Sequence, residues 1–192
     1  MILFKIFISA FLIDNVVLMR FLALCPFIGM STDEDKSIGM GLAVTFVMVL
    51  ATCVTYPIHI FILKPKGLEF LQLLVFILVI ASLVQLVEFY LKKSAPALYS
   101  SMGIYLALIT TNCAILGVTL DVISKDYSFV ESVVYAFGAA MGFLLSLLLL
   151  AGVRKRLRTS PVPSFMKGTP ILFVAAALLS LAFTGFSGLV KF

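Results

Sequence analysis

Five long stretches without a charged residue constrain this chain more than any other feature. They contain 27, 18, 27, 22 and 23 residues and run from Ser37 to Leu63, Phe70 to Val87, Ser94 to Leu120, Ser132 to Val153 and Gly168 to Val190. A helix needs about 20 apolar residues to cross a lipid bilayer, so each stretch predicts a membrane-spanning helix. Only 12% of the 192 residues are charged, about half the share of a soluble domain. This composition excludes a soluble enzyme, and the basic residues that give the net charge of +5 lie in loops, which argues against nucleic-acid binding.

The first 30 residues form a sixth apolar segment, although it carries Lys5, Asp14 and Arg20. No small-residue cleavage site follows a clean apolar core, so the segment predicts a retained first span and not a signal peptide. The connections between the spans are short. The expected fold is therefore an all-α integral membrane protein, with six transmembrane helices in a single membrane domain covering residues 1–192.

The distribution of lysine and arginine predicts the orientation in the membrane. Eight basic residues lie on the side that the chain reaches after its first, third and fifth spans, and five lie on the opposite side, with Arg20 left out of the count. The cluster from Arg154 to Arg158 accounts for much of this excess. Because basic loops remain in the cytoplasm, both termini are expected on the outer side.

Two similar segments recur 88 residues apart, namely Cys25-Pro-Phe-Ile-Gly29 and Cys113-Ala-Ile-Leu-Gly117. They divide the chain into two halves of three spans each, repeat one over about 1–92 and repeat two over about 97–192. Three is an odd number, so the second half starts on the opposite side of the membrane and the halves form an inverted repeat. Inverted repeats bring equivalent residues together near the midplane, often on interrupted helices.

The residues beside the two cysteines predict interruptions of the first and fourth spans. Pro26 is expected to break the helix after Cys25, and Gly29 to permit an irregular turn. Before Cys113, the side chains of Thr110, Thr111 and Asn112 can satisfy freed backbone groups. The same three residues are candidates for contacting a cation or for surrounding a cofactor at Cys113. Cys25 and Cys113 would then approach each other from opposite faces.

Two opposed cysteines allow several chemistries. They can form a disulfide, supply half of a metal site, or be small core residues. An iron–sulfur cluster normally takes four protein ligands, so the pair cannot complete one alone. A related second subunit that brings two further thiolates would complete one [2Fe–2S] cluster, which would serve electron transfer.

Ionisable groups inside the first span are further candidates, because such groups in a membrane usually have a function. Asp14 with Asn15 can line an ion path; the alternatives are an interfacial position near a helix end or a contact with a partner. Arg20 is six residues from Asp14 and does not share its face on a regular helix. Gly138-x-x-x-Gly142 fits close helix packing.

The segments that carry the cysteines resemble a known family. The matching stretches are Asp14 to Gly29, Ser37 to Ala43, Leu108 to Gly117, Tyr135 to Ala140 and Leu181 to Lys191. They are similar to the A subunit of the Rnf complex and to the homologous E subunit of the sodium-pumping NADH:quinone reductase. The resemblance extends over essentially the whole chain.

This resemblance implies a subunit that is not catalytic alone and that pairs with a homologous, oppositely oriented six-helix membrane subunit. It implies that Cys25 and Cys113 bind a [2Fe–2S] cluster shared with that partner. The chain would relay electrons between iron–sulfur subunits in the cytoplasm and flavin-bearing subunits on the outer side. The complex would transfer electrons between ferredoxin and NAD, coupled to Na⁺ or H⁺ translocation across a bacterial cytoplasmic (inner) membrane.

A stand-alone secondary ion transporter is the main alternative, because inverted repeats and interrupted helices are also features of transporters. A transporter needs no iron and no pair of cysteines.

Overall fold

A computed structural model describes residues 2–31, 34–67, 69–94, 108–161, 163 and 166–187, and every regular element in these ranges is a helix. The elements before residue 95 are α1 (Ile2–Ile8), the π-helix η1 (Ser9–Ile13), α2 (Leu24–Met30), α3 (Glu34–Ile58), the π-helix η2 (His59–Leu63), α4 (Lys64–Lys66), the 3₁₀-helix η3 (Glu69–Leu71) and α5 (Gln72–Ser94). A helical turn at 108–110 precedes α7 (Cys113–Ser124), α8 (Phe129–Thr159) and α9 (Thr169–Ser187).

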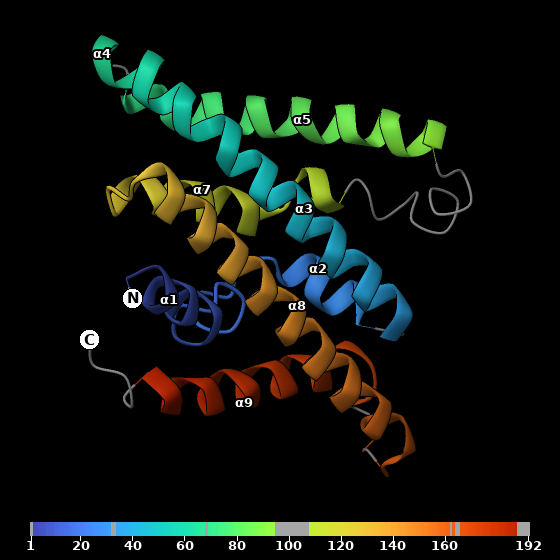
Figure 1. The fold of residues 1–192 in the computed structure, drawn as a ribbon. Helices are drawn as coiled ribbons and strands as arrows, with labels where there is room; N and C mark the ends of the chain where they lie inside the picture. Colours follow the sequence, from blue (N-terminus) through green and yellow to red (C-terminus); the bar gives the residue numbers. More distant parts are fainter. Residues whose placement is uncertain are drawn as a thin grey trace.

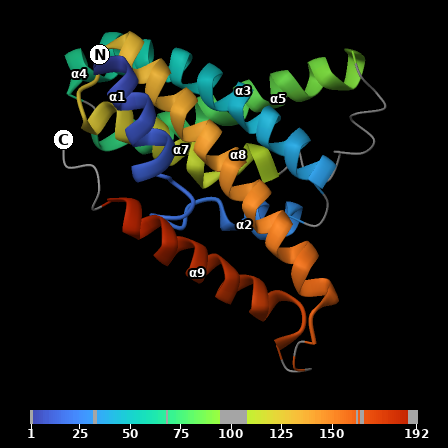
Figure 2. The same ribbon diagram turned by 60° about the horizontal axis from the view of Figure 1, so that its bottom comes forward.

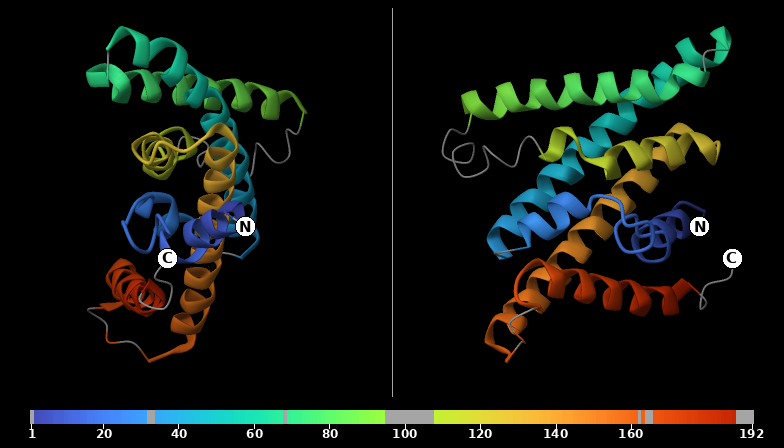
Figure 3. Two further views of the ribbon diagram at one scale, coloured as in Figure 1. Left: turned by 60° about the vertical axis from the view of Figure 1, so that its left-hand side comes forward. Right: turned by 180° about the vertical axis from the view of Figure 1, so that it is seen from behind.

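The helices form two layers. The long helices α3 and α8 make the most extensive helix–helix contact and run antiparallel in one diagonal layer (Figure 1). The second layer lies behind them, with α5 and α9 at its two edges and α7 and the α1–α2 segment between them (Figures 2 and 3). Large buried side chains fill the space between the layers, among them Phe27, Met40, Tyr135, Phe143 and Leu147.

The described residues contain three helices that are long and apolar enough to cross a membrane: Ser37–Leu63, Gln72–Phe89 and Phe129–Thr159. Three shorter apolar helices, Leu3–Ile13, Leu108–Ser124 and Thr169–Gly185, lie in the other predicted spans. Much of the fourth predicted span, residues 95–107, lies outside the described residues. Many large apolar side chains are exposed, Phe70 at 96% and Phe61 at 78%, as expected of surfaces that face lipid.

Helix α8 extends beyond the apolar stretch that predicted it, and local sequence signals explain both ends. The side chain of Ser128 and that of Glu131 form a reciprocal capping box at its start, which satisfies two otherwise unpaired N–H groups. The helix ends at Thr159, shortly before Pro161. Its 31 residues span about 46 Å, more than the bilayer core of about 30 Å, so an end of the helix extends past that core.

The small residues of α8 allow the first segment to pack closely. A Cβ atom at Gly138 would lie 3.0 Å from the carbonyl oxygen of Phe7, and one at Gly142 would lie 2.8 Å from that of Phe11. A larger residue at either position would require the backbone of the first segment to shift. The prediction of close packing at Gly138-x-x-x-Gly142 is therefore confirmed, and its partner is the α1–η1 segment.

Candidate functional site

The first span is interrupted before Cys25, and the predicted cause of the interruption was wrong. Residues 14–23, the linking segment, join η1 to α2 without regular helix. Phe21 and Ala23 adopt φ angles of 54° and 61°, in the left-handed region that non-glycine residues rarely adopt. Pro26 lies in the first turn of α2, where its missing N–H group has no helical partner to lose. Pro26 thus lies in the first turn of a helix instead of breaking one.

Gly29 is a second correction, because it lies inside α2 and not in an irregular turn. A Cβ atom at Gly29 would meet nothing within 4 Å, so no close contact there requires glycine. The irregular backbone conformation that was expected at Gly29 occurs instead at Phe21 and Ala23.

Cys113 is the first residue of α7, and Asn112 caps that helix. The Oδ1 atom of Asn112 accepts a hydrogen bond from the backbone N–H of Ala114 at 3.0 Å. Residues 111–112 interrupt the helix, as expected for the fourth span. Cys113 thus lies at the point where the helix of the fourth span resumes.

The end of the linking segment, just before Cys25, contacts the start of α7. The backbone N–H of Ala23 donates a hydrogen bond to the Sγ atom of Cys113 at 2.8 Å. Beside it, a Cβ atom at Gly117 would lie 3.0 Å from the Cδ1 atom of Leu22. The end of the linking segment, two residues before Cys25, thus packs on the start of α7.

Both cysteines are free and exposed, so in this structure they are neither a disulfide nor part of the core. Among the residues that the structure describes, no group of three or more His, Cys, Asp or Glu side chains is able to hold a metal ion. Any metal site at Cys25 and Cys113 would therefore need ligands from outside the described chain.

Asn112 supplies a test of whether the site fits an anionic sulfur group. Its Nδ2 atom is buried and has no hydrogen-bond partner among the described residues, and the residue is 4% exposed. Buried donors without partners are rare and cost about 1–3 kcal/mol each. Cluster sulfides and thiolates accept hydrogen bonds, so a cluster at the adjacent Cys113 would be chemically suited to this donor. The residues present fit such a group.

Asn15 holds the start of the linking segment against α8. It is fully buried, and its Nδ2 atom donates to the carbonyl oxygen of Gly142 at 3.0 Å and to the Oγ atom of Ser146 at 2.8 Å. Its Oδ1 atom accepts from the backbone N–H groups of Val17 at 3.1 Å and Leu18 at 3.4 Å. The side chain thus replaces hydrogen bonds that the interrupted helix lacks.

Arg20 and Asp14 each form an ion pair at the far end of α7. The Nη1 atom of Arg20 lies 2.6 Å from both carboxylate oxygens of Asp121. The Nζ atom of Lys125 lies 3.0 Å from the Oδ2 atom of Asp14. The hydroxyl of Tyr135 also donates to Asp121, at 3.3 Å. The linking segment therefore runs antiparallel to α7, with a sulfur contact at one end and two ion pairs at the other.

Lys125 follows the last residue of α7, and its environment favours the charged form. Burial lowers the pKa of its ammonium group, but the hydrogen bond to Asp14 and the nearby charges outweigh burial and raise it. The Nζ atom also lies 4.7 Å from the ring centroid of Tyr135, a cation–π distance.

The sequence did not identify Asp121, Lys125 and Tyr135 as partners of the first span. One signal of the Arg20–Asp121 pair was available in the sequence. Arg20 lies five residues before Cys25, and the oppositely charged Asp121 lies eight residues after Cys113. Of the other predicted residues, Thr110 is half-buried and Thr111 is exposed, both directly before the cap of α7.

Comparison with known proteins identifies the family. Residues 3–190 match the family described as "Rnf-Nqr subunit, membrane protein". The chain belongs to the Rnf-Nqr family. This confirms the resemblance seen in the motifs, and the apolar helices agree with a multi-pass membrane protein.

Relatives in this family match the chain over nearly its whole length. The A subunit of the ion-translocating oxidoreductase complex of Syntrophotalea carbinolica is 55% identical over 98% of this chain and 97% of its own. The A subunit of the Na⁺-translocating ferredoxin:NAD⁺ oxidoreductase complex of Acetobacterium woodii is 52% identical over 98% of each chain. The A subunit of the ion-translocating oxidoreductase complex of Vibrio cholerae is 49% identical over 96% of this chain and 95% of its own. All three relatives are named as subunits of a complex.

Proposed function

We propose that this chain is the electron-transfer A subunit of an ion-translocating ferredoxin:NAD oxidoreductase complex in a bacterial cytoplasmic membrane. The near full-length similarity to relatives named as A subunits of ion-translocating oxidoreductase complexes supports the assignment, and the Acetobacterium woodii relative is the one whose name includes ferredoxin and NAD⁺. The chain would act only within its complex, beside iron–sulfur and flavin-bearing subunits.

The site of electron transfer in this proposal is a [2Fe–2S] cluster for which Cys25 and Cys113 supply half of the ligands. The contact between the Ala23 N–H group and the Cys113 sulfur is the observation that supports it most, because Ala23 lies only two residues before Cys25. When bound, the cluster would take up and release one electron. Ala23 would stabilise the Cys113 thiolate, and Asn112 would offer its unpaired N–H to the same site.

The remaining two ligands would come from a homologous six-helix subunit of opposite orientation. Two inverted three-helix repeats, over about 1–92 and 97–192, would build each subunit. The antiparallel packing of α3 along α8, the positions of α5 and α9 at opposite edges, and the central placement of α7 and the α1–α2 segment support this symmetry (Figure 3). Both termini would face the outer side.

The residues predicted for an ion path fall into two groups. Thr110, Thr111 and Asn112 directly precede Cys113, and we assign them to the surroundings of the cluster. Asp14 pairs with Lys125 at the other end of α7, about 18 Å from Cys113 at 1.5 Å per residue. Asp14 therefore remains the candidate for contact with Na⁺ or H⁺, whereas Asn15 holds the linking segment.

Electron paramagnetic resonance of the reduced, purified complex tests the cluster assignment. The Cys25→Ser and Cys113→Ser variants should each lose one [2Fe–2S] signal and the corresponding iron and acid-labile sulfide. Cys53→Ser is the matched control, because this third free cysteine lies within α3, and its signal should equal that of the wild type.

A signal that survives loss of Cys113 would overturn the assignment. A stand-alone ion transporter predicts a different pattern, in which the chain transports ions without the other subunits and both serine variants keep full transport.

A further inference from the structure

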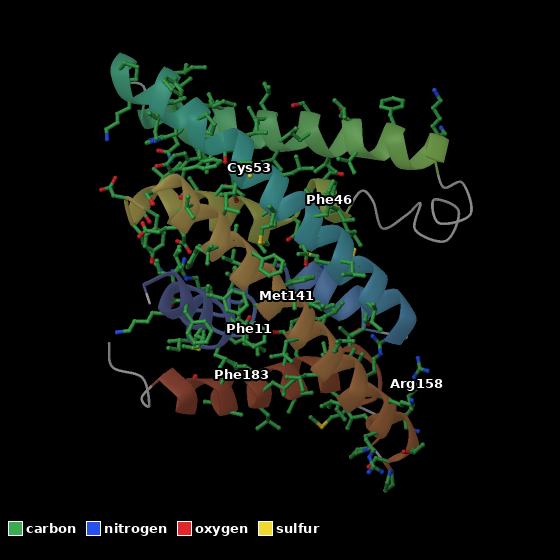
Figure 4. All side chains as sticks on the ribbon, in the orientation of Figure 1. Phe11, Phe46, Cys53, Met141, Arg158 and Phe183 are labelled. Carbon is green, nitrogen blue, oxygen red and sulfur yellow. The ribbon has the colours of Figure 1, made fainter. Side chains whose placement is uncertain are left out.

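The C-terminal end of α8 and the start of α9 enclose a basic cavity that the electron-transfer role does not use. Its volume is about 400 Å³, and Leu157, Ser160, Gly168, Ile171 and Leu172 line it together with the basic residues Arg154, Arg158 and Lys167. No acidic side chain is among these described lining residues. Figure 4 shows Arg158 near the end of α8, where side-chain nitrogens gather.

The three basic side chains play unequal parts. Arg154 is half-buried, and its Nη1 atom donates to the carbonyl oxygen of Ile28 at 3.0 Å and to the Oγ atom of Ser31 at 3.2 Å. These bonds hold it at the end of α2. Arg158 and Lys167 are exposed, and neither has an acidic partner within the part of the chain that the structure describes. Like charges around one cavity repel each other, and a bound anion would relieve this repulsion.

An apolar cavity of about 430 Å³ continues from the basic one between the same two helices. Its lining consists only of apolar side chains: Val153, Leu157, Ile171, Val174, Ala175, Leu178 and Leu179. Leu157 and Ile171 line both cavities. A cationic mouth thus opens into a hydrocarbon-lined groove, and this polarity matches a molecule with an anionic head and an acyl chain.

We propose that this double cavity is a binding site for one anionic phospholipid, with the phosphate between Arg158 and Lys167 and an acyl chain between α8 and α9. Basic pockets between transmembrane helices bind such headgroups on the cytoplasmic side of membranes, the side to which the loop charges assign this end of α8. A free inorganic anion would use the basic cavity but would leave the apolar groove empty. The proposal does not depend on the cluster.

Retention of phosphatidylglycerol by the purified complex tests the charged part of the site. The complex is washed with detergent, incubated with nanodiscs containing phosphatidylglycerol or phosphatidylcholine, and analysed for bound lipid by native mass spectrometry. Arg158→Gln should weaken phosphatidylglycerol binding about fivefold, and the Arg158→Gln/Lys167→Gln double variant about 25-fold, since each basic residue contributes about this much. Phosphatidylcholine binding should be weak and unchanged.

Arg156→Gln is the matched control, because Arg156 is exposed two residues from Arg158 and does not line the cavity. It should bind phosphatidylglycerol as the wild type does. If Arg158→Gln and Arg156→Gln lower binding equally, the effect is one of general surface charge and the proposal fails.

The apolar groove is tested separately. Val174→Trp should fill the groove and reduce phosphatidylglycerol binding without changing the charge. Leu181→Trp is the control, since Leu181 is exposed on α9 and does not line the groove. Two outcomes would overturn the proposal. If inorganic phosphate competes with the lipid and Val174→Trp leaves lipid binding unchanged, the cavity is a site for a free anion. If Arg158→Gln leaves lipid binding unchanged but the complex loses another protein component, the surface is a protein docking site.

Discussion

Asn15 lies ten positions before Cys25, whereas Asn112 immediately precedes Cys113. Asn15 is bonded across the molecule to α8 and also to the backbone of its own segment. Asn112 caps its own helix with one oxygen and leaves its nitrogen unpaired. Asn15 therefore fixes the linking segment, which precedes Cys25, against α8. Asn112 instead caps α7 and leaves an N–H donor next to Cys113.

The largest effect is expected where Gly142 of α8 packs against Phe11 and Asn15 of the first segment. In Gly142→Ala, the new Cβ atom would lie 2.8 Å from the carbonyl oxygen of Phe11 and 3.3 Å from the Nδ2 atom of Asn15. Overpacking against backbone should lower the free energy of unfolding by about 3 kcal/mol, measured by denaturant titration in micelles. Gly152→Ala on the same helix meets nothing within 4 Å and should be neutral or slightly stabilising. Equal effects would show that helix propensity, and not the contact, controls stability.

The two asparagines should differ when each is replaced by leucine of similar size. Asn15→Leu removes the partners of two backbone N–H groups and of Gly142, and should cost about 2 kcal/mol of unfolding free energy. Asn112→Leu removes one helix cap, but it also removes a buried donor that has no partner among the described residues. The second effect offsets part of the first, so the unfolding free energy should fall by only about 1 kcal/mol. The same denaturant titration measures both variants. A larger cost for Asn112→Leu would reverse the comparison.

The ion pair between Arg20 and Asp121 should make a smaller contribution. The side chain of Arg20 is 41% exposed and that of Asp121 is 14% exposed. A double-mutant cycle with Arg20→Met and Asp121→Asn should give a coupling energy of roughly 0.5–1 kcal/mol, typical of exposed pairs. No coupling would mean that this ion pair does not help to hold the linking segment against α7.

The smallest effect concerns Lys125, whose pKa is raised by its hydrogen bond to Asp14 against the opposing effect of burial. A raised pKa in the folded state means that the pair stabilises the protein at pH values below the ordinary lysine value of 10.5. This stabilisation should disappear as the pH rises through the folded-state pKa. The melting temperature of the wild type should exceed that of Lys125→Met at neutral pH, and the difference should shrink above pH 10.5. A constant difference would exclude the charge as its source.

Charge-free stretches located the three long apolar helices of the described residues, because such stretches and the signals at helix ends are local. The ends of α8 illustrate this, with Ser128 and Glu131 at its start and Pro161 after its end. The cause of the first interruption could not be predicted, because the left-handed residues are Phe21 and Ala23 and not the neighbouring Gly29. Contacts from α7 and α8 hold that conformation, and local sequence carries no sign of them.

The same limit applies to the candidate site. The two cysteines were identified from their recurrence, and Asp14, Asn15 and Arg20 from their polarity inside an apolar segment. Their partners lie more than 100 residues away in the chain, at 101 for Arg20 with Asp121 and 111 for Asp14 with Lys125. No periodicity links residues at such separations, so one sequence does not reveal the pairing.

The sequence by itself determined that the chain is helical and apolar enough for a membrane, and it marked the two cysteine motifs, because these properties depend on residue type and short-range spacing. Only the tertiary structure decided that the linking segment lies along α7 and that the Cys113 sulfur meets the backbone of Ala23. The physical reason is that a buried polar group must find its partner wherever folding brings one within hydrogen-bond reach.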